Sequence, residues 1–262
     1  MTFRLLTWNI YRGGQGRAPR LARVIEACAP DLVLLQEATR PDVVEEVARL
    51  TGMSEWRAYE RQSLGFLSRS PVLQASWHRP RVCRHAFVEI APSTAPVRIF
   101  GVHLSAVHAA WTEQRRVFEL RALLRSVQRE QRGLHVLAGD FNTLAPGASL
   151  DPARLPFRLR PLLWASAGRV RWRTVRVLLD HGYVDAFRHF HPDEPGFTMP
   201  SWDPHVRLDY AFVPAAYAGV LRACEIVRHP DVIAASDHAP VLLELDVDAT
   251  HQQQGTTTAA VA

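Results

Sequence analysis

The sequence predicts an α/β protein in which two mixed β-sheets pack face to face and helices cover their outer surfaces. Apolar runs of strand length recur along the chain, and two packed sheets would bury all of them. The first fifty residues alternate strand and helix, which favours parallel strands, whereas residues 84–104 favour an antiparallel hairpin. With 262 residues, 47% of them hydrophobic, the chain can form one large core.

The first half of the chain is expected to begin as strand, helix, strand and helix. Residues 3–9 are an apolar run, and a glycine-rich turn separates them from a short helix over residues 20–28. The run LVLLQE follows as a fully buried strand, and Pro41 suits the first turn of a helix over residues 41–51. Four more strands are expected, the last two forming the hairpin: residues 64–69, 72–77, 84–91 and 97–104.

The clearest helix of the second half is expected over residues 111–130, where apolar residues recur at helical spacing. The run HVLAGDFN is a buried strand that opens into an irregular segment, residues 144–171. A helix near residues 172–181 ends before Gly182. Three more strands are expected at residues 207–213, 221–227 and 240–246. We predict one domain over residues 1–248 and a disordered polar tail over residues 249–262.

Composition excludes several classes of protein. No window holds about 18 uninterrupted apolar residues, so we expect no transmembrane helix. The N-terminus lacks the pattern of a signal peptide, and the three cysteines are far apart without a CxxC motif, so we expect buried reduced thiols and a cytoplasmic location. The net charge is +5 and all 31 basic residues are arginine, which fits either genomic base composition or an anionic partner.

Six polar signatures stand at the ends of the predicted strands, where an apolar run can bury itself and deliver its polar end to one edge of a sheet. They contain Asn9, Glu37, His103, Asp140 with Asn142, Asp209, and Asp237 with His238. If these ends converge, one cleft holds two histidines, several carboxylates and two amides. That set is suited to divalent-metal hydrolysis of a phosphate ester.

The GDFN signature is the most specific of the six. Asp140 lies just past a strand, where its carboxylate can orient and deprotonate a water molecule. Asn142 can donate to a phosphoryl oxygen without adding negative charge. The same spacing also occurs in an Asx turn after a strand, which would be purely structural.

The other signatures also allow a structural explanation. In RLDYAFV we expect Arg207 and Asp209 on one strand face, where Asp209 can fix the tautomer of a histidine or simply pair with Arg207 at the surface. His238 can equally be a hydrogen-bonded core histidine. Glu37, after an apolar run, is costly to bury unless it is paired or binds a metal. A purely structural explanation of the sequence is correct only if it applies to all six signatures at the same time.

The series WN, QE, GVHL, GDFN, RLDY and SDHAPV, in this order, resembles the endonuclease/exonuclease/phosphatase superfamily, which has the deoxyribonuclease-I-like fold. The resemblance extends from residue 3 to about residue 246 and is to small bacterial metal-dependent hydrolases of that superfamily. It implies a four-layer α/β/β/α sandwich with the cleft at one edge of the two sheets. It also implies a hydrolase of phosphoric esters.

The resemblance further implies a role for each signature. Mg²⁺ or Mn²⁺ would be held mainly by Glu37, with Asn9 and Asp237 near the metal. Asp140 would position the water for in-line attack, Asn142 would support the phosphate, and Asp209 would pair with His238. His103 would stabilise the phosphate or help to protonate the leaving oxygen.

Two points of the chemistry stay open at this stage. His238 can be a general base, or a cation that stabilises the transition state while Asp140 takes the proton. Some relatives carry an aspartate two residues after the asparagine of WN, where this chain has Tyr11. This difference disfavours a second metal on that side, and Tyr11 can instead stack on or hydrogen-bond the substrate. Arg12 can reach a phosphate.

The substrate is expected to depend on residues 144–171, which contain several arginines, Arg169 among them, and Trp164. These residues can grip a nucleic acid, lie on an anionic phospholipid surface, or form an ordinary solvated loop. Trp202 is expected at the rim of the cleft. Our first hypothesis is a phosphodiesterase acting on a nucleic acid or a lipid headgroup ester.

The second hypothesis is a phosphomonoesterase acting on a sugar or inositol phosphate. A third is a non-catalytic binding module on the same fold, but such a module would be expected to lack Glu37, Asp140 or His238, and all three are present. The sequence indicates no protein partner.

Overall fold

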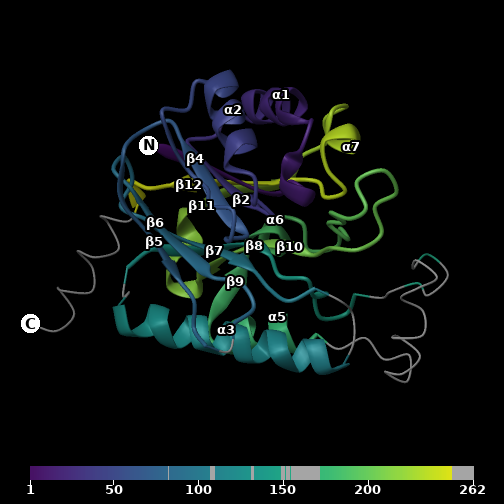
Figure 1. The fold of residues 1–262 in the computed structure, drawn as a ribbon. Helices are drawn as coiled ribbons and strands as arrows, with labels where there is room; N and C mark the ends of the chain where they lie inside the picture. Colours follow the sequence, from purple (N-terminus) through teal and green to yellow (C-terminus); the bar gives the residue numbers. More distant parts are fainter. Residues whose placement is uncertain are drawn as a thin grey trace, which may run out of the picture.

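The chain folds into four layers (Figure 1), as the sequence and its resemblance predict. In this computed structural model two six-stranded sheets lie face to face, with α1 and α2 on one outer surface and α3 and α5 on the other. The structure describes residues 1–81, 83–106, 110–130, 133–148, 151, 154 and 172–249. The predicted tail from residue 250 onward, and most of the arginine-rich segment, lie outside these residues.

The first sheet unites strands from the two ends of the described chain, in the order β11–β12–β1–β2–β4–β3. β1 runs parallel to β2 and antiparallel to β12, so that Thr2 lies opposite Asp246. The bounds are β1 Thr2–Asn9, β2 Leu32–Gln36, β3 Glu55–Arg57, β4 Leu64–Ser68, β11 Leu221–Ile226 and β12 Val241–Asp246.

The second sheet has the order β5–β6–β7–β8–β10–β9. β7 runs antiparallel to β6, as the predicted hairpin requires, and parallel to β8, while β8 pairs antiparallel with β10. The bounds are β5 Val72–His78, β6 Phe87–Pro92, β7 Arg98–His103, β8 His135–Asp140, β9 Tyr183–Asp185 and β10 Asp209–Pro214.

Helices begin and end where the sequence provides the matching signals. Pro41 occupies the first turn of α2, and Gly52 adopts the left-handed conformation that ends it. The helices are α1 Ala18–Cys28, α2 Pro41–Thr51, α3 Ala110–Glu130, α5 Arg173–Asp180, α6 Ala186–Phe190 and α7 Val232–Ala235, with 3₁₀ turns η1 Arg12–Gly14 and η4 Ala215–Val220. In the described part of the chain no helix has the length and apolar character needed to cross a bilayer.

Three apolar layers hold these elements together. Alternate residues of β2 face opposite sides: Leu34 packs between the two sheets, and Leu35 packs beneath α1 and α2. This explains why the strand is apolar throughout. A third layer joins the second sheet to α3 and α5. The sheets approach closely at Gly101, where a Cβ atom would lie 2.6 Å from the Leu34 side chain. All three cysteines are free and buried, as expected.

Several boundaries differ from the sequence prediction. The strand expected at residues 207–213 begins only at Asp209, and the one expected at residue 84 begins at Phe87. β3 and β9 were not predicted, because three residues are too few to show a period. The short helices α6 and α7 were missed for the same reason. Ala249, placed in the predicted tail, packs against the core between the sheets.

Candidate active site

The topology brings all six signatures to one edge of the sandwich. β1 and β2 are parallel, so Asn9 and Glu37 follow the same end of neighbouring strands. β7 and β8 are also parallel, and His103 lies directly opposite Asp140. β10 and β12 run the other way, so their starts lie at this edge. Asp209 opens β10 opposite Asp140, and His238 lies just before β12.

His238 and Asp209 form a buried ion pair at the centre of the site. The Nδ1 atom of His238 lies 2.8 Å from Oδ2 of Asp209, and both side chains are almost fully buried. Burial opposes a charge on the imidazole, but the charge and hydrogen bond of Asp209 outweigh it and raise the pKa of His238 to about 10. At neutral pH this histidine is therefore charged, which favours a role at the site over that of a neutral core histidine.

Asp140 is the most densely hydrogen-bonded carboxylate of the site. Its Oδ1 accepts the backbone N–H of Asn142 at 2.8 Å, and its Oδ2 accepts the side-chain amides of Asn9 at 3.0 Å and Asn142 at 3.1 Å. Full burial and the nearby charge of Asp209 raise the pKa of Asp140 to about 7, although His238 and Asn9 oppose that rise. A carboxylate with this pKa can exchange a proton near neutral pH.

Glycine is required immediately before Asp140. Gly139 has a φ of +138°, and a Cβ atom there would lie 2.0 Å from the carbonyl oxygen of Val102 on β7. No other residue fits so close to the neighbouring strand. The bond from the Asn142 backbone to Asp140 is the Asx-type contact anticipated from the sequence, but it is part of the site rather than an alternative to it.

Glu37, Asn9 and Asp237 lie on the first-sheet side of the site. Glu37 has a φ of +56°, and its carboxylate accepts the backbone N–H of Arg12 at 2.5 Å and the Asn9 amide at 3.4 Å. A non-glycine residue in this conformation is uncommon and often marks a functional position. The Asn9 amide therefore lies between Glu37 and Asp140, and its oxygen accepts the backbone N–H of Tyr11 at 3.0 Å.

The donor set on this side fits a hard divalent cation. Burial, together with the charge of Glu37, raises the pKa of Asp237, although His238 opposes the rise. A bound cation would relieve this penalty on Asp237, and Mg²⁺ and Mn²⁺ prefer oxygen ligands of this kind. Glu37 and Asp237 would hold the ion, with the Asn9 oxygen available as a neutral ligand.

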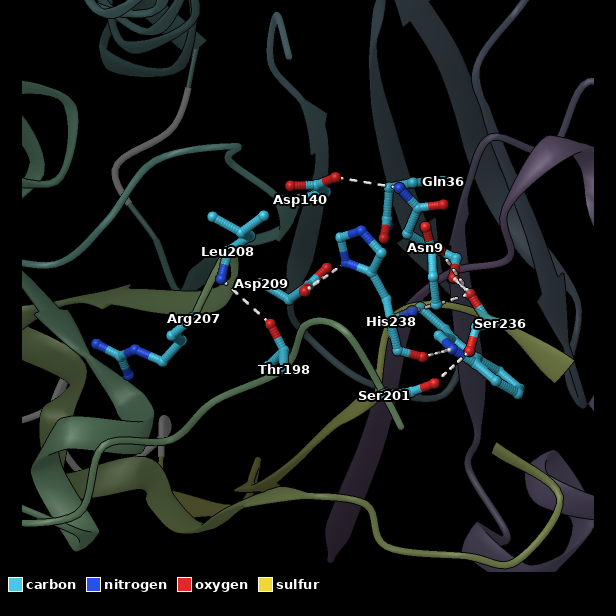
Figure 2. Close-up of polar contacts among 12 residues, drawn as sticks. Asn9, Gln36, Asp140, Thr198, Ser201, Arg207, Leu208, Asp209, Ser236 and His238 are labelled. Carbon is cyan, nitrogen blue, oxygen red and sulfur yellow. Dashed lines mark hydrogen bonds and ion pairs between the residues drawn. The ribbon is translucent and has the colours of Figure 1, made fainter. Parts of the chain in front are cut away.

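A second acidic group offers ligand atoms in the same cleft. Atoms of Asp140, Asp209 and His238 lie within 4.8 Å of one another (Figure 2). However, the Asp209–His238 hydrogen bond occupies one ligand atom of each, and a protonated imidazole cannot coordinate a metal. Among the described residues none donates a hydrogen bond to the buried Oδ1 atom of Asp209, which leaves one carboxylate oxygen free in this group.

His103 lies near Asp140, as the sequence predicts, but two neighbours on it were not predicted. Its Nε2 atom is 3.8 Å from Oδ2 of Asp140, and its Nδ1 atom is 2.5 Å from the Ser63 hydroxyl. The His85 ring stacks on it with ring centroids 4.6 Å apart and planes 1° from parallel. Neither Ser63 nor His85 follows an apolar strand, so no signal in the sequence marks them.

Arg207 corrects one prediction. Arg207 was expected to share a strand face with Asp209, or to form a surface ion pair with it. Instead its guanidinium pairs with buried Asp185 and lies over the Tyr210 ring, 4.5 Å from the centroid. The strand begins only at Asp209, so the alternation of faces does not extend back to Arg207. Figure 2 shows its side chain directed away from the His238–Asp209 pair.

Buried glutamates of α3 support the two loops that carry the site. Glu113 accepts the Thr143 hydroxyl at 3.0 Å, next to Asn142, and also the backbone N–H of Thr174 at the start of α5. Glu119 accepts the Ser105 hydroxyl at 2.8 Å, two residues after His103. These contacts hold the segments that follow β7 and β8 in place. They require two glutamate carboxylates of α3 to be buried, which is costly unless they are paired.

The predicted substrate-binding residues are placed as follows. Two guanidinium groups lie over the Tyr11 ring, with the Cζ atom of Arg12 5.0 Å and that of Arg17 5.5 Å from its centroid. Arg12 is exposed beside Glu37. Trp202 is 60% exposed, and its neighbour Ser201 donates its backbone N–H to the carbonyl oxygen of Asp237 at 2.7 Å. Arg169 and Trp164 lie outside the described residues.

A profile of the endonuclease/exonuclease/phosphatase family matches residues 6–238. The chain belongs to this family. The family comprises divalent-metal-dependent hydrolases of phosphoester bonds, nucleases and phosphatases among them. No curated protein matches the sequence.

Solved structures of similar fold come from enzymes that act on DNA and from one further family member. A 3′ phosphatase from Neisseria bound to a product DNA hairpin is 22% identical, with a TM-score of 0.68 over 93% of this chain and 99% of that one. An AP endonuclease from Archaeoglobus fulgidus is 17% identical, with a TM-score of 0.71 over 94% and 100%. A family member from Beutenbergia cavernae is 20% identical, with a TM-score of 0.68 over 94% and 72%. At these identities the likeness shows the fold.

Proposed function

We propose that this protein is a divalent-metal-dependent phosphodiesterase that cleaves a nucleic acid by in-line attack of water. The single observation that carries the proposal is geometric: Asp140, His103 and the Asp209–His238 ion pair converge in one buried cleft. Asp140, with a pKa of about 7, can accept a proton at neutral pH, whereas His238, with a pKa of about 10, holds one. Hydrolysis of a phosphate ester needs both a base and a nearby positive charge.

Asp140 is assigned as the residue that orients the attacking water and takes its proton. Amide donors from Asn9 and Asn142 hold its carboxylate from two sides, which fixes its direction in the cleft. Its elevated pKa makes it a stronger base than an exposed aspartate, so proton transfer is better matched to neutral pH. Under this proposal Asp140, rather than His238, is the base.

His238 is assigned as the cation that stabilises negative charge on the phosphoryl group. Asp209 holds its Nδ1 proton, so the Nε2 proton is available to a phosphoryl oxygen. The main chain fixes the ring further: the Trp8 indole donates to the His238 carbonyl at 2.8 Å. His103 completes the group as a donor that adds no negative charge. The Asn142 amide donates to the Leu104 carbonyl and to Asp140, so it reaches a phosphoryl oxygen by exchanging one of these bonds.

The Glu37 and Asp237 carboxylates would hold the metal. When bound, Mg²⁺ or Mn²⁺ supplies a Lewis acid that offsets charge on the phosphoryl oxygens. The contribution of the chain is to keep the two carboxylates in place. The backbone N–H of Arg12 fixes one end of Glu37, and the Ser236 hydroxyl contacts both the Asn9 carbonyl at 2.6 Å and Asp237 at 3.5 Å.

Surface features around the cleft support a nucleic acid as substrate. Exposed Arg12 lies on one side, and the charge of Arg84 is near enough on the other to lower the pKa of His103. Trp202 offers an exposed ring on which a base can stack. Two of the similar structures are of a DNA 3′ phosphatase and an AP endonuclease. A 3′-phosphate on DNA is therefore the second candidate substrate.

A substrate panel tests the proposal. The purified protein is incubated with Mg²⁺, Mn²⁺ or EDTA and offered a bis-ester reporter, a mono-ester reporter, DNA with and without a 3′-phosphate, and anionic phospholipid vesicles. We expect metal-dependent cleavage of the bis-ester and of DNA, and we expect Asp140→Asn to abolish it. The control variant Asp193→Asn removes an exposed carboxylate that belongs to none of the six signatures, and it should retain the activity. Preference for the mono-ester, or for vesicles over DNA, contradicts it.

A further inference from the structure

The second histidine of the cleft is held by a hydrogen bond that crosses between the two sheets. Ser63 immediately precedes β4 in the first sheet, whereas His103 ends β7 in the second. The Ser63 hydroxyl and the Nδ1 atom of His103 are 2.5 Å apart, and both side chains are buried. The Ser63 carbonyl accepts the backbone N–H of Ala38 at 3.0 Å, directly after Glu37. Ser63 thus connects the Glu37 turn to His103.

The surroundings of the imidazole select one of its two neutral tautomers. A serine hydroxyl carries one hydrogen, and in the described residues the acceptor within reach of Ser63 is Nδ1 of His103. On the other side of the ring, Nε2 faces a carboxylate oxygen of Asp140 at 3.8 Å. A proton on Nε2 is attracted to that oxygen, whereas a lone pair is repelled. Both contacts favour Nδ1 as acceptor and Nε2–H as donor.

His103 is also kept uncharged and in one plane. Burial and then the charges of His85 and His238 lower its pKa well below the usual value, with Arg84 acting in the same direction. The parallel His85 ring covers one face of the imidazole. The segment with His85 is itself fixed, because the backbone N–H of Arg84 donates to the buried carboxylate of Glu119 at 3.0 Å.

We propose that Ser63 is a positioning residue that sets the tautomer of His103, so that a neutral imidazole presents its Nε2–H to a phosphoryl oxygen of the substrate. The Nε2–H joins the side-chain amides of Asn9 and Asn142, which approach the same oxygen of Asp140. The cleft therefore has two histidines with different tasks: His238 supplies charge, and His103 supplies a directed, uncharged donor. The role in turnover rests on the proposed function, whereas the tautomer does not.

Nitrogen-15 NMR of histidine-labelled protein tests the tautomer without any substrate. The His103 signals are assigned by their loss in His103→Asn. We expect Nε2 to carry the proton and Nδ1 to be bare, unchanged between about pH 5 and about pH 8. Ser63→Ala should populate both tautomers, and Ser63→Thr, which keeps the hydroxyl, should restore one. Ser68→Ala, which removes another buried hydroxyl at the far end of β4, the strand that Ser63 precedes, should leave His103 unchanged.

Steady-state kinetics on the bis-ester reporter test the role in turnover. We expect Ser63→Ala to lower kcat about 5- to 20-fold with little change in KM, because donation to the transition state is weakened more than binding. Ser63→Thr should recover most of the rate, and Ser68→Ala all of it.

A proton on Nδ1 in the wild-type protein, or identical His103 signals in Ser63→Ala, overturns the inference. An unchanged kcat in Ser63→Ala overturns the role in turnover. Absence of any esterase activity in the wild-type protein contradicts the proposed function instead, and leaves the NMR result to decide the tautomer.

Discussion

Replacing Asp140 by asparagine should remove activity and yet stabilise the protein at neutral pH. The carboxylate is 1% exposed, and its pKa rises from 3.8 to about 7, chiefly through burial and secondly through the charge of Asp209. An ionised Asp140 is therefore more costly in the folded protein than in the unfolded chain. Active sites commonly carry such a penalty, because the groups that perform chemistry are not those that favour folding.

The magnitude follows from the two pKa values. One pKa unit corresponds to about 1.4 kcal/mol, so ionised Asp140 costs the fold about 4 kcal/mol. The folded-state pKa is the higher one, so the stability associated with this group is fully present below about pH 4 and is lost as the pH rises to about 7. Asparagine shows no such loss, but it satisfies fewer of the three N–H donors, which costs about 1–3 kcal/mol at every pH.

The variant should thus be less stable than the wild type near pH 4 and more stable above about pH 7. Urea unfolding in EDTA at a series of pH values measures the free energy of unfolding of both proteins, with Asp193→Asn as the control. The difference between variant and wild type should change by about 4 kcal/mol across this range. A difference that is constant with pH would refute the raised pKa of Asp140, and with it the assignment of the base.

Three more predictions test other parts of the site. The rate constant kcat/KM should rise as Asp140 loses its proton near pH 7 and fall as His238 loses its proton near pH 10. The variant His238→Gln should be about 100-fold slower, and its kcat/KM should show no fall at alkaline pH. Calorimetry with Mn²⁺ should show at least about tenfold weaker binding to Glu37→Gln, and equal affinity would remove Glu37 from the metal site. Gly139→Ala should cost about 3 kcal/mol or more in thermal unfolding, because its Cβ meets the neighbouring strand, whereas Gly133→Ala, in open space, should cost almost nothing.

The elements that the sequence predicts well are those whose signal is local. An apolar run followed by a polar residue is visible at Glu37 and Asp140 without knowledge of the fold. The apolar residues indicate a strand buried on both faces, and the polar residue that follows them indicates the end of that strand at an edge of the sheet. The paired order of strands then brings these ends together, as the registers of β7, β8 and β10 confirm. The two helices with a proline near the start, α1 and α2, were located to within about two residues, and α2 also ends at a glycine.

What the sequence does not predict depends on partners from distant segments. Ser63 matters because of a histidine 40 residues away, and nothing adjacent to it marks this contact. Arg207 was assigned to the wrong partner because Asp185 belongs to β9, which is too short to recognise. The pKa values of Asp140 and His238 likewise follow from burial and from the charge of Asp209, which is distant from both in sequence, so they can be obtained only from coordinates.

The pairing of β1 with β12 has a consequence for the newly made chain. Residues 2–7 of the first strand find their antiparallel neighbour only at residues 241–246, and His238 lies just ahead of that neighbour. A chain emerging from the ribosome can complete the second sheet long before the first one closes. A chain that stops short of residue 238 would therefore hold Asp140 but lack both His238 and the strand that pairs with β1.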